Sequence, residues 1–326
     1  MASLSGQFIE RLTEPGARLS WLTDWLLHDV WSTSAYTELG PLEYLNRGEL
    51  AVNSAEEVIA AAAGRVYDEL LTPPPPERDL KVFLREQQPC AVVVFDGLSL
   101  REMPLLMSLA EKARLEVKET GASLSAVPSE TIDFLGQRLA SNISPSQLAQ
   151  RRDLGGIALA AYYYGDPMQQ HRLDENCDCL LLWSAFPDNT YSDSGARFPN
   201  HFENMHQALE TAWKNTVMMV PSGRRILVTS DHGYVYFGSG MSFARSNPEV
   251  RPLTDFLGGE RYRRLAGTAQ APRNPDLKVL PDRQLAVVQG RVQTHPPGPA
   301  SARLYKHGGL SLMEMLTPWI VLEGPA

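Results

Sequence analysis

Polar side chains of the types that bind metal ions or act as nucleophiles follow several apolar stretches of this sequence. In ILVTSDHGYVYFG, residues 226–238, a run of β-forming residues leads to an adjacent carboxylate and imidazole. Five segments supply such groups: Asp96, then Ser129 and Thr131, then Asp188 and Asp193, then Asp231 and His232, and finally His307. Oxygen and imidazole ligands without thiolates suit Zn²⁺ or Mn²⁺, and suit Mg²⁺ and Ca²⁺ less well because histidine is among them. The residue types therefore indicate a metal site.

These candidate ligands are close to what two divalent ions and a nucleophile need. Two ions roughly 4 Å apart can activate a nucleophile and stabilise the leaving oxygen of a phosphoryl transfer. A threonine hydroxyl such as that of Thr131 is a weak nucleophile alone, and a metal ion would activate it. Taken singly, Asp96, Ser129 and Thr131 also suit turns or helix caps, and His307 suits a polar loop. Their shared position at the ends of successive segments favours the metal site.

The apolar stretches before these residues have the pattern of buried strands that alternate with helices. The expected strands cover residues 90–99, 115–129, 179–188 and 226–238. Helical patterns separate them, as in LREMPLLMSLAEKA and HFENMHQALETAWKNTVMMV. The sequence therefore predicts an α/β fold with a doubly wound sheet flanked by helices. Ligands of such sheets bind beyond the carboxyl ends of the strands, where the candidate residues stand.

A run of four prolines at residues 73–76 divides the chain, because proline cannot continue a helix. Residues 1–78 are predicted to form a helical N-terminal segment with a proline linker, in which Ser54 before Glu57 has the form of a capping box. Residues 79–326 are predicted to form the α/β domain. Within it, residues from about 239 to 300 are rich in proline, glycine and arginine, and we expect an insertion of loops and short strands there.

The composition argues against several other classes of protein. With a formal net charge of -8, nucleic acid remains a candidate partner only through a local basic patch. Two small basic clusters, Arg224–Arg225 and the group Arg261, Arg263 and Arg264, are interpreted as solvated surface. Three cysteines, an odd number, suit a reducing compartment better than a disulfide framework. No signal peptide or membrane span is visible, so we expect a soluble, cytoplasmic protein.

The order of the motifs resembles the alkaline phosphatase superfamily, with an Asp, a Thr in PSET, an Asp pair, an Asp-His and a His before Gly-Gly. More narrowly, VVVFDGLS, VPSET, VTSDHG and HGGLSLMEMLTP resemble a PglZ domain, which is known from phage-defence (BREX) systems and some response regulators. The resemblance covers residues from about 90 to 322. It implies an alkaline phosphatase-like fold and a metal-dependent phosphohydrolase, more specifically a phosphodiesterase in phage defence or signalling. Nucleotides or nucleic acid are candidate phosphoester substrates, and other defence-system proteins are candidate partners.

The resemblance also implies two divalent metal ions, with Zn²⁺ expected and Mn²⁺, Mg²⁺ or Ca²⁺ as alternatives. Their ligands are Asp96, Thr131, Asp231 and His232 for one ion, and Asp188 and His307 for the other. Thr131 is in addition the implied nucleophile.

The third ligand of the second ion is where this chain departs from the family pattern. Relatives place an Asp or His four residues after the aspartate equivalent to Asp188, and this chain has Ser192 there. Asp193 is the expected replacement, and His201 is a second choice. Because of this departure, a metal-binding scaffold of a defence complex with little or no activity is the alternative to an enzyme.

Overall fold

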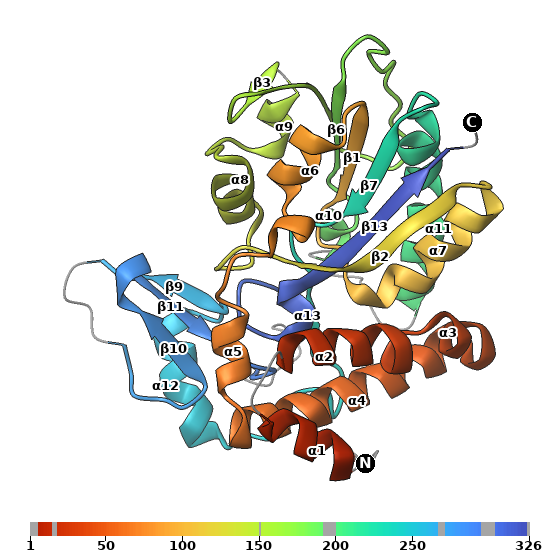
Figure 1. Ribbon diagram of the computed structural model, residues 1–326. Helices are drawn as coiled ribbons and strands as arrows, with labels where there is room; N and C mark the ends of the chain where they lie inside the picture. Colours follow the sequence, from red (N-terminus) through yellow and green to blue (C-terminus); the bar gives the residue numbers. More distant parts are fainter. Residues whose placement is uncertain are drawn as a thin grey trace.

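The computed structural model describes residues 6–14, 18–149, 151–191, 200–266, 271–294 and 304–324 (Figure 1). A six-stranded mixed sheet lies in the upper part of the view, with the strand order β2–β13–β7–β1–β6–β5. Its strands are β1 (Cys90–Phe95), β2 (Glu116–Leu124), β5 (Ala160–Tyr164), β6 (Cys179–Ser184), β7 (Arg225–Thr229) and β13 (Leu316–Glu323). The predicted α/β fold class is confirmed.

Helices cover both faces of this sheet, as a doubly wound arrangement requires. They are α6 (Leu80–Glu86), α7 (Met103–Lys112), α8 (Thr131–Leu139) and α11 (Asn200–Asn215). Alternate residues of β1 point to opposite faces. Val92 and Val94 pack in one core with α6 and α8, whereas Ala91, Val93 and Phe95 pack in another with α7 and α11. Every residue of β1 is therefore buried, which explains its unbroken apolar run.

One strand of the sheet, β13, was not expected from the sequence. It lies between β2 and β7 and runs antiparallel to both, so the sheet is mixed. Pro318 within it lacks the amide donor that an interior strand normally needs, and the strand follows α13 (Leu312–Met315) without a turn. Because β13 is antiparallel, the segment before it reaches the edge of the sheet where β2 and β7 end.

The N-terminal segment is helical, as predicted, and packs below the sheet in Figure 1. Its elements are α1 (Gly6–Thr13), α2 (Arg18–Trp25), the π-helix η1 (Leu26–Val30), α3 (Thr33–Leu39), α4 (Pro41–Ala62) and α5 (Arg65–Glu69). Their buried side chains belong to the same core cluster as one face of the sheet. Ser54 lies inside α4, so the capping box predicted from Ser54 and Glu57 is wrong. The prolines lead into the short 3₁₀-helix η2 (Pro76–Arg78).

The segment between β7 and β13 contains a small subdomain with a core of its own. Its elements are β8 (Val235–Tyr236), α12 (Asn247–Leu257), β9 (Tyr262–Arg264), β10 (Leu277–Leu280), β11 (Leu285–Val288) and β12 (Tyr305–Lys306). β10, β11 and β9 form a three-stranded antiparallel sheet, seen at the lower left of Figure 1. β8 pairs with β12, which brings the two ends of the segment together.

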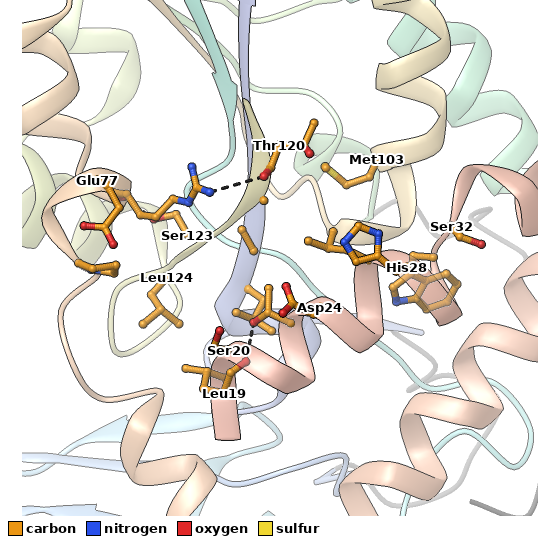
Figure 2. A pocket seen from close by; sticks show the side chains of 18 of the residues that line it. Leu19, Ser20, Asp24, His28, Ser32, Glu77, Met103, Thr120, Ser123 and Leu124 are labelled. Carbon is orange, nitrogen blue, oxygen red and sulfur yellow. Dashed lines mark hydrogen bonds between the residues drawn. The ribbon is translucent and has the colours of Figure 1, made fainter. Parts of the chain in front are cut away.

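A cavity of about 860 Å³ lies between the N-terminal helices and β2, the edge strand of the large sheet. Figure 2 shows Thr120 and Ser123 of β2 on one side, and Asp24 of α2 and His28 of η1 on the other. None of the candidate metal ligands that the structure describes lines it. Among the described residues, no helix has the length and apolar character needed to cross a lipid bilayer.

Candidate metal centre

Five segments of the chain meet at one edge of the large sheet. β1 lies between β7 and β6 and runs parallel to both, so the carboxyl ends of these three strands are adjacent. Asp96 directly follows β1, Asp231 shortly follows β7, and Asp188 begins α10 (Asp188–Tyr191) after β6. Thr131 begins α8 after β2, and His307 directly follows β12, shortly before α13 and β13. The expected convergence at the strand ends is thus present.

A glycine allows two of the carboxylates to approach each other. The amide of Asp188 donates to the carbonyl oxygen of Asp96 at 2.9 Å. Gly97 has a φ of +72°, and a β-carbon there would lie 2.9 Å from the β-carbon of Asp188. Its amide donates to Asp231 Oδ1 at 3.1 Å. Glycine is therefore required at this position both by the left-handed backbone and by the close approach of Asp188.

The four residues assigned by resemblance to one ion lie together. The Thr131 hydroxyl donates to Asp231 Oδ2 at 2.7 Å and lies 3.3 Å from Asp96 Oδ1. His232 Nε2 lies 3.6 Å from Asp96 Oδ1 and 3.7 Å from Asp231 Oδ2. Ligand atoms of Asp96, Asp231 and His232 all lie within 4.8 Å of one another. Asp231 and His232 are fully buried, and Asp96 nearly so.

A second group contains Asp188 and His307, and it shares His232 with the first. Ligand atoms of these three residues also lie within 4.8 Å of one another. His307 Nε2 is 3.6 Å from Asp188 Oδ1, and the rings of His307 and His232 are stacked with their centroids 4.1 Å apart. The expected third ligand, Asp193, and the alternative Ser192 lie outside the described residues. The side chain of His201 is not described either.

The spacing of these side chains fits a metal ion better than a hydrogen-bonded cluster. His232 Nδ1 lies 3.0 Å from the carbonyl oxygen of Gly233, which favours a proton on Nδ1 and a lone pair on Nε2. That Nε2 is buried and has no hydrogen-bond partner among the described residues. Ligands at about 2.1 Å from a tetrahedral ion lie about 3.4 Å from one another. The separations of 3.6 and 3.7 Å between Nε2 and the oxygens of Asp96 and Asp231 are close to that value.

The electrostatics of the site also favour a cation. Burial, followed by the negative charges of Asp231 and Asp188, raises the pKa of Asp96 well above its ordinary value. Burial disfavours a charged His307, but a hydrogen bond to Glu130 and the charges of Glu130 and Asp188 outweigh it and raise the pKa of the imidazole to about 10. A divalent ion would relieve the repulsion among the carboxylates, and it would compete with a proton for His307.

Sequence reasoning missed two side chains that hold the candidate ligands. Trp183 of β6 donates from Nε1 to Asp96 Oδ2 at 3.1 Å. Glu130 Oε1 lies 3.3 Å from Nδ1 of His307. A tryptophan in a buried apolar strand has the sequence pattern of a core residue, so nothing marked Trp183. Glu130 stands directly before Thr131, and an acid beside the candidate nucleophile could have been noticed.

Ser129, the other hydroxyl considered as a nucleophile, has a structural position. It is fully buried, its hydroxyl accepts from the amide of Gly308 at 2.8 Å, and it donates to the carbonyl oxygen of Gly309 at 3.2 Å. The carbonyl oxygen of Ser129 lies 3.0 Å from Nδ1 of His307. Ser129 thus stabilises the loop that contains His307 through hydrogen bonds, whereas Thr131 faces the carboxylates of Asp96 and Asp231.

Replacing Trp183 with phenylalanine should weaken metal binding by about tenfold or more, because partners that orient a ligand typically contribute 10–100-fold to metal affinity. Phenylalanine keeps an aromatic ring in the core but removes the Nε1 donor to Asp96. Titration of metal into the apo-protein measures the effect. A Trp183→Phe variant with the affinity of the wild type would show that this hydrogen bond does not orient Asp96 for a metal ion.

A cavity of about 540 Å³ opens beside the second group of ligands. Asp188, His307 and Glu130 contribute to its lining, together with residues of β9 and β12. Lys306 in this lining pairs with Glu260 at 3.0 Å, so the wall contributed by β12 carries a charge that is already neutralised. Since the 860 Å³ cavity near β2 contains none of the candidate ligands, this smaller cavity is the candidate substrate site.

In sequence, the chain matches no protein-family model and no curated protein. Its structure is similar to murine ectonucleotide pyrophosphatase/phosphodiesterase 5 in an inactive form in complex with AMP, with a TM-score of 0.44 and 14% sequence identity over 74% of this chain and 89% of that chain. Human ectonucleotide pyrophosphatase/phosphodiesterase 5 gives a TM-score of 0.42 and 12% identity over 73% and 88% of the two chains. Phosphonoacetate hydrolase from Sinorhizobium meliloti in complex with phosphonoacetate gives 0.39 and 12% over 72% and 90%.

Proposed function

We propose that the protein is a metal-dependent phosphoester hydrolase, more specifically a phosphodiesterase, with Thr131 as its nucleophile. The observation that carries the proposal is the position of the Thr131 hydroxyl, 2.7 Å from Asp231 Oδ2. Next to it lies a buried nitrogen of His232 that has no hydrogen-bond partner among the described residues. A hydroxyl held among carboxylates and a free imidazole nitrogen has the surroundings of an activated nucleophile.

The residues around Thr131 have distinct roles in this proposal. The proposed ligands are Asp96, Asp231 and His232 with Thr131 for one ion, and Asp188 and His307 for the other. Two divalent ions held there, with Zn²⁺ preferred, would supply positive charge to the attacking and leaving oxygens of a phosphoryl transfer. Asp231 Oδ2 accepts the hydrogen bond of the Thr131 hydroxyl and so orients its oxygen for in-line attack on phosphorus.

The start of α8 contributes to the same step. Thr131 is the first residue of this helix, and the N-cap residue Glu130 makes no side-chain capping bond to it. The first amides of a helix lack intrahelical partners and favour an anion. They would therefore stabilise the phosphoryl group that passes to Thr131 as one alcohol of the diester departs, until water cleaves the new ester of Thr131 and releases the phosphate monoester.

A chromogenic phosphodiester and the matching monoester test the proposal. We expect hydrolysis of the diester to exceed that of the monoester, to stop when a chelator removes the metal, and to return when Zn²⁺ or Mn²⁺ is added. If metal-free protein hydrolysed the diester as fast as metal-loaded protein, the proposal would be contradicted. Metal binding without turnover of either ester would support the scaffold alternative instead.

The second ion is expected to bind more weakly than the first, with Asp193 as its third ligand. A serine hydroxyl stays protonated near neutral pH and adds no charge, so Ser192 holds a dication less well than a carboxylate would. Titrating metal into the apo-protein should therefore show two affinities, and Asp193→Ala should remove only the weaker one. Normal binding of both ions by Asp193→Ala would assign the third ligand to another residue, and His201 would be tested next.

The resemblance to PglZ domains extends this proposal to a biological setting. From this resemblance we propose that the protein acts in the cytoplasm, in phage defence or signalling, together with other defence-system proteins. Nucleotides and nucleic acid are the diester substrates to compare first. The net charge of -8 favours a small nucleotide over a long polyanion, because the latter needs an extended basic surface.

A further inference from the structure

Arg261, which the sequence placed in a solvated cluster, is completely buried at the start of the β9 strand region. Its guanidinium forms a bidentate ion pair with Glu314 of α13, with Nε 2.6 Å from Oε1 and Nη2 2.8 Å from Oε2. Two further bonds reach the carbonyl oxygens of Val292 at 2.9 Å and Gly290 at 2.6 Å. The expectation of a surface residue was therefore wrong. Arg261 instead connects the inserted subdomain to the segment that follows His307.

Glu314, the partner of Arg261, contacts the loops of both histidines. Its carboxylate accepts the amides of Gly309 at 2.8 Å and Ser311 at 3.1 Å, close after His307 in the chain. Its carbonyl oxygen accepts the amide of Gly233, the residue after His232, at 3.0 Å. One residue thus fixes the backbone beside both stacked imidazoles, although its hydrogen bonds reach none of the described candidate ligands.

Two glycines make this close packing feasible. A β-carbon at Gly309 would lie 2.7 Å from Nη2 of Arg261, and one at Gly233 would lie 2.2 Å from the carbonyl oxygen of Met313. Any side chain at Gly309 would push the guanidinium away from Glu314. The sequence H-G-G, singled out for its histidine, therefore also makes room for a buried arginine.

We propose that Arg261 and Glu314 are a positioning pair that sets the relative geometry of His232 and His307, and through it the affinity of the metal centre. A buried ion pair is a weak source of net stability, but its fixed geometry can specify a conformation. Arginine is suited to this role because its planar fork donates from several nitrogens at once, which lysine cannot reproduce. The inference rests on the proposed function, since it concerns the ligands of the proposed ions.

The test compares Arg261→Lys with a control elsewhere in the same subdomain. Arg245 pairs bidentately with Asp276 at 2.7 and 2.9 Å. The ion pair itself includes no residue of either histidine loop, so Arg245→Lys removes a bidentate pair of the same subdomain. Two measurements are made on each protein. One is backbone amide hydrogen exchange of the apo-protein across residues 230–236 and 305–315. The other is titration with Zn²⁺ alone.

In Arg261→Lys, the backbone amides of both segments should exchange faster than in the wild type. Zn²⁺ should bind at least about tenfold more weakly, which is the effect expected when a group that orients metal ligands is lost. Turnover should show a lower kcat with little change in KM. Arg245→Lys should change neither the exchange of these segments nor the Zn²⁺ affinity. Equal behaviour of the two variants in exchange and in Zn²⁺ binding would overturn the inference.

A second variant keeps the inference testable where Arg261→Lys does not fold. Gly309→Ala leaves both charges in place, and its β-carbon would meet the guanidinium of Arg261, so it should reproduce the faster exchange and the weaker Zn²⁺ binding. Wild-type amide exchange and wild-type Zn²⁺ affinity in Gly309→Ala would overturn the inference. A wild-type protein that binds no divalent ion would contradict the proposed function itself. Faster amide exchange in the apo-forms of the two variants would still show that the pair positions the two loops, and unchanged exchange would show that it does not.

Discussion

Replacing Thr131 with alanine is expected to lower kcat for a phosphodiester by roughly 10⁴-fold or more, which is the order of loss when the nucleophile of a covalent mechanism is removed. A methyl group cannot attack phosphorus, and the carboxylates of Asp96 and Asp231 remain to bind metal. Thr131 is half-buried at the first position of α8, and alanine removes its hydrogen bond to the buried carboxylate of Asp231, so the free energy of unfolding of the metal-free protein should fall by about 1–3 kcal/mol. Steady-state kinetics at saturating metal measure the effect.

Two matched variants complete this experiment. Thr131→Ser retains a hydroxyl and should keep much of the activity. Ser129→Ala should retain the nucleophile but lower the free energy of unfolding by about 1–2 kcal/mol, because it leaves the amide of Gly308 without its acceptor in the protein interior. If Ser129→Ala abolished turnover while Thr131→Ala kept it, Ser129 would be the nucleophile and the arrangement proposed here would be wrong.

Replacing Asp231 with alanine should remove the more tightly bound metal ion. Asp231 is fully buried, and its two oxygens accept hydrogen bonds from the amide of Gly97 and the hydroxyl of Thr131, which hold the carboxylate between the loop after β1 and the start of α8. We expect the affinity for this metal ion to fall by more than about 100-fold. That is the upper end of the effect of groups that only orient a ligand, and Asp231 is proposed as a ligand itself. Elemental analysis after dialysis and metal titration of the apo-protein measure the loss.

Controls for Asp231→Ala separate loss of metal from loss of fold. Asp231 contributes to the raised pKa of Asp96, so its removal relieves repulsion between two buried carboxylates in the metal-free protein. This gain opposes the loss of hydrogen bonds, and the Tm of the apo-protein should change little. Asp255→Ala, at an exposed acid paired with Arg251 on α12, should keep the wild-type metal content. Wild-type metal content in Asp231→Ala would refute the assignment of this ligand.

The elements that present the candidate site were predictable because their sequence signals are local. β1 and β6 are short apolar runs with both faces buried, and the polar residues directly after the strands mark where each strand ends. The rule that ligands gather at the carboxyl ends of parallel strands then placed Asp96, Asp188 and Asp231 at one edge. The structure brings them together with Thr131 and His307, and their roles as ligands and nucleophile remain our proposal.

The parts that could not be predicted depend on partners far away in the sequence. Arg261 stands in the polar stretch RYRRL, and only its pairing with Glu314 explains why it is buried. Trp183 has the pattern of a core residue, and its hydrogen bond to Asp96 depends on the pairing of β6 with β1. β13 was missed because Pro318 is unfavourable in an interior strand. Local patterns carry no information about which distant group will supply the compensating contact.

The place of β13 in the sheet has a consequence for the order in which the molecule can assemble. A chain made from its N-terminus produces β13 after every other strand of the large sheet, yet β13 separates β7 from β2. Until β13 is inserted, β2 has no neighbouring strand in this sheet. The first residues of α8, which follow β2 in the chain, are then not held by the sheet beside the ends of β1 and β7. Domains form during synthesis as their contacts become available. An incomplete nascent chain ending before residue 316 would thus carry all the candidate ligands while lacking the strand that joins β2, the strand before Thr131, to the rest of the sheet, so completion of the centre would be a late event in biosynthesis.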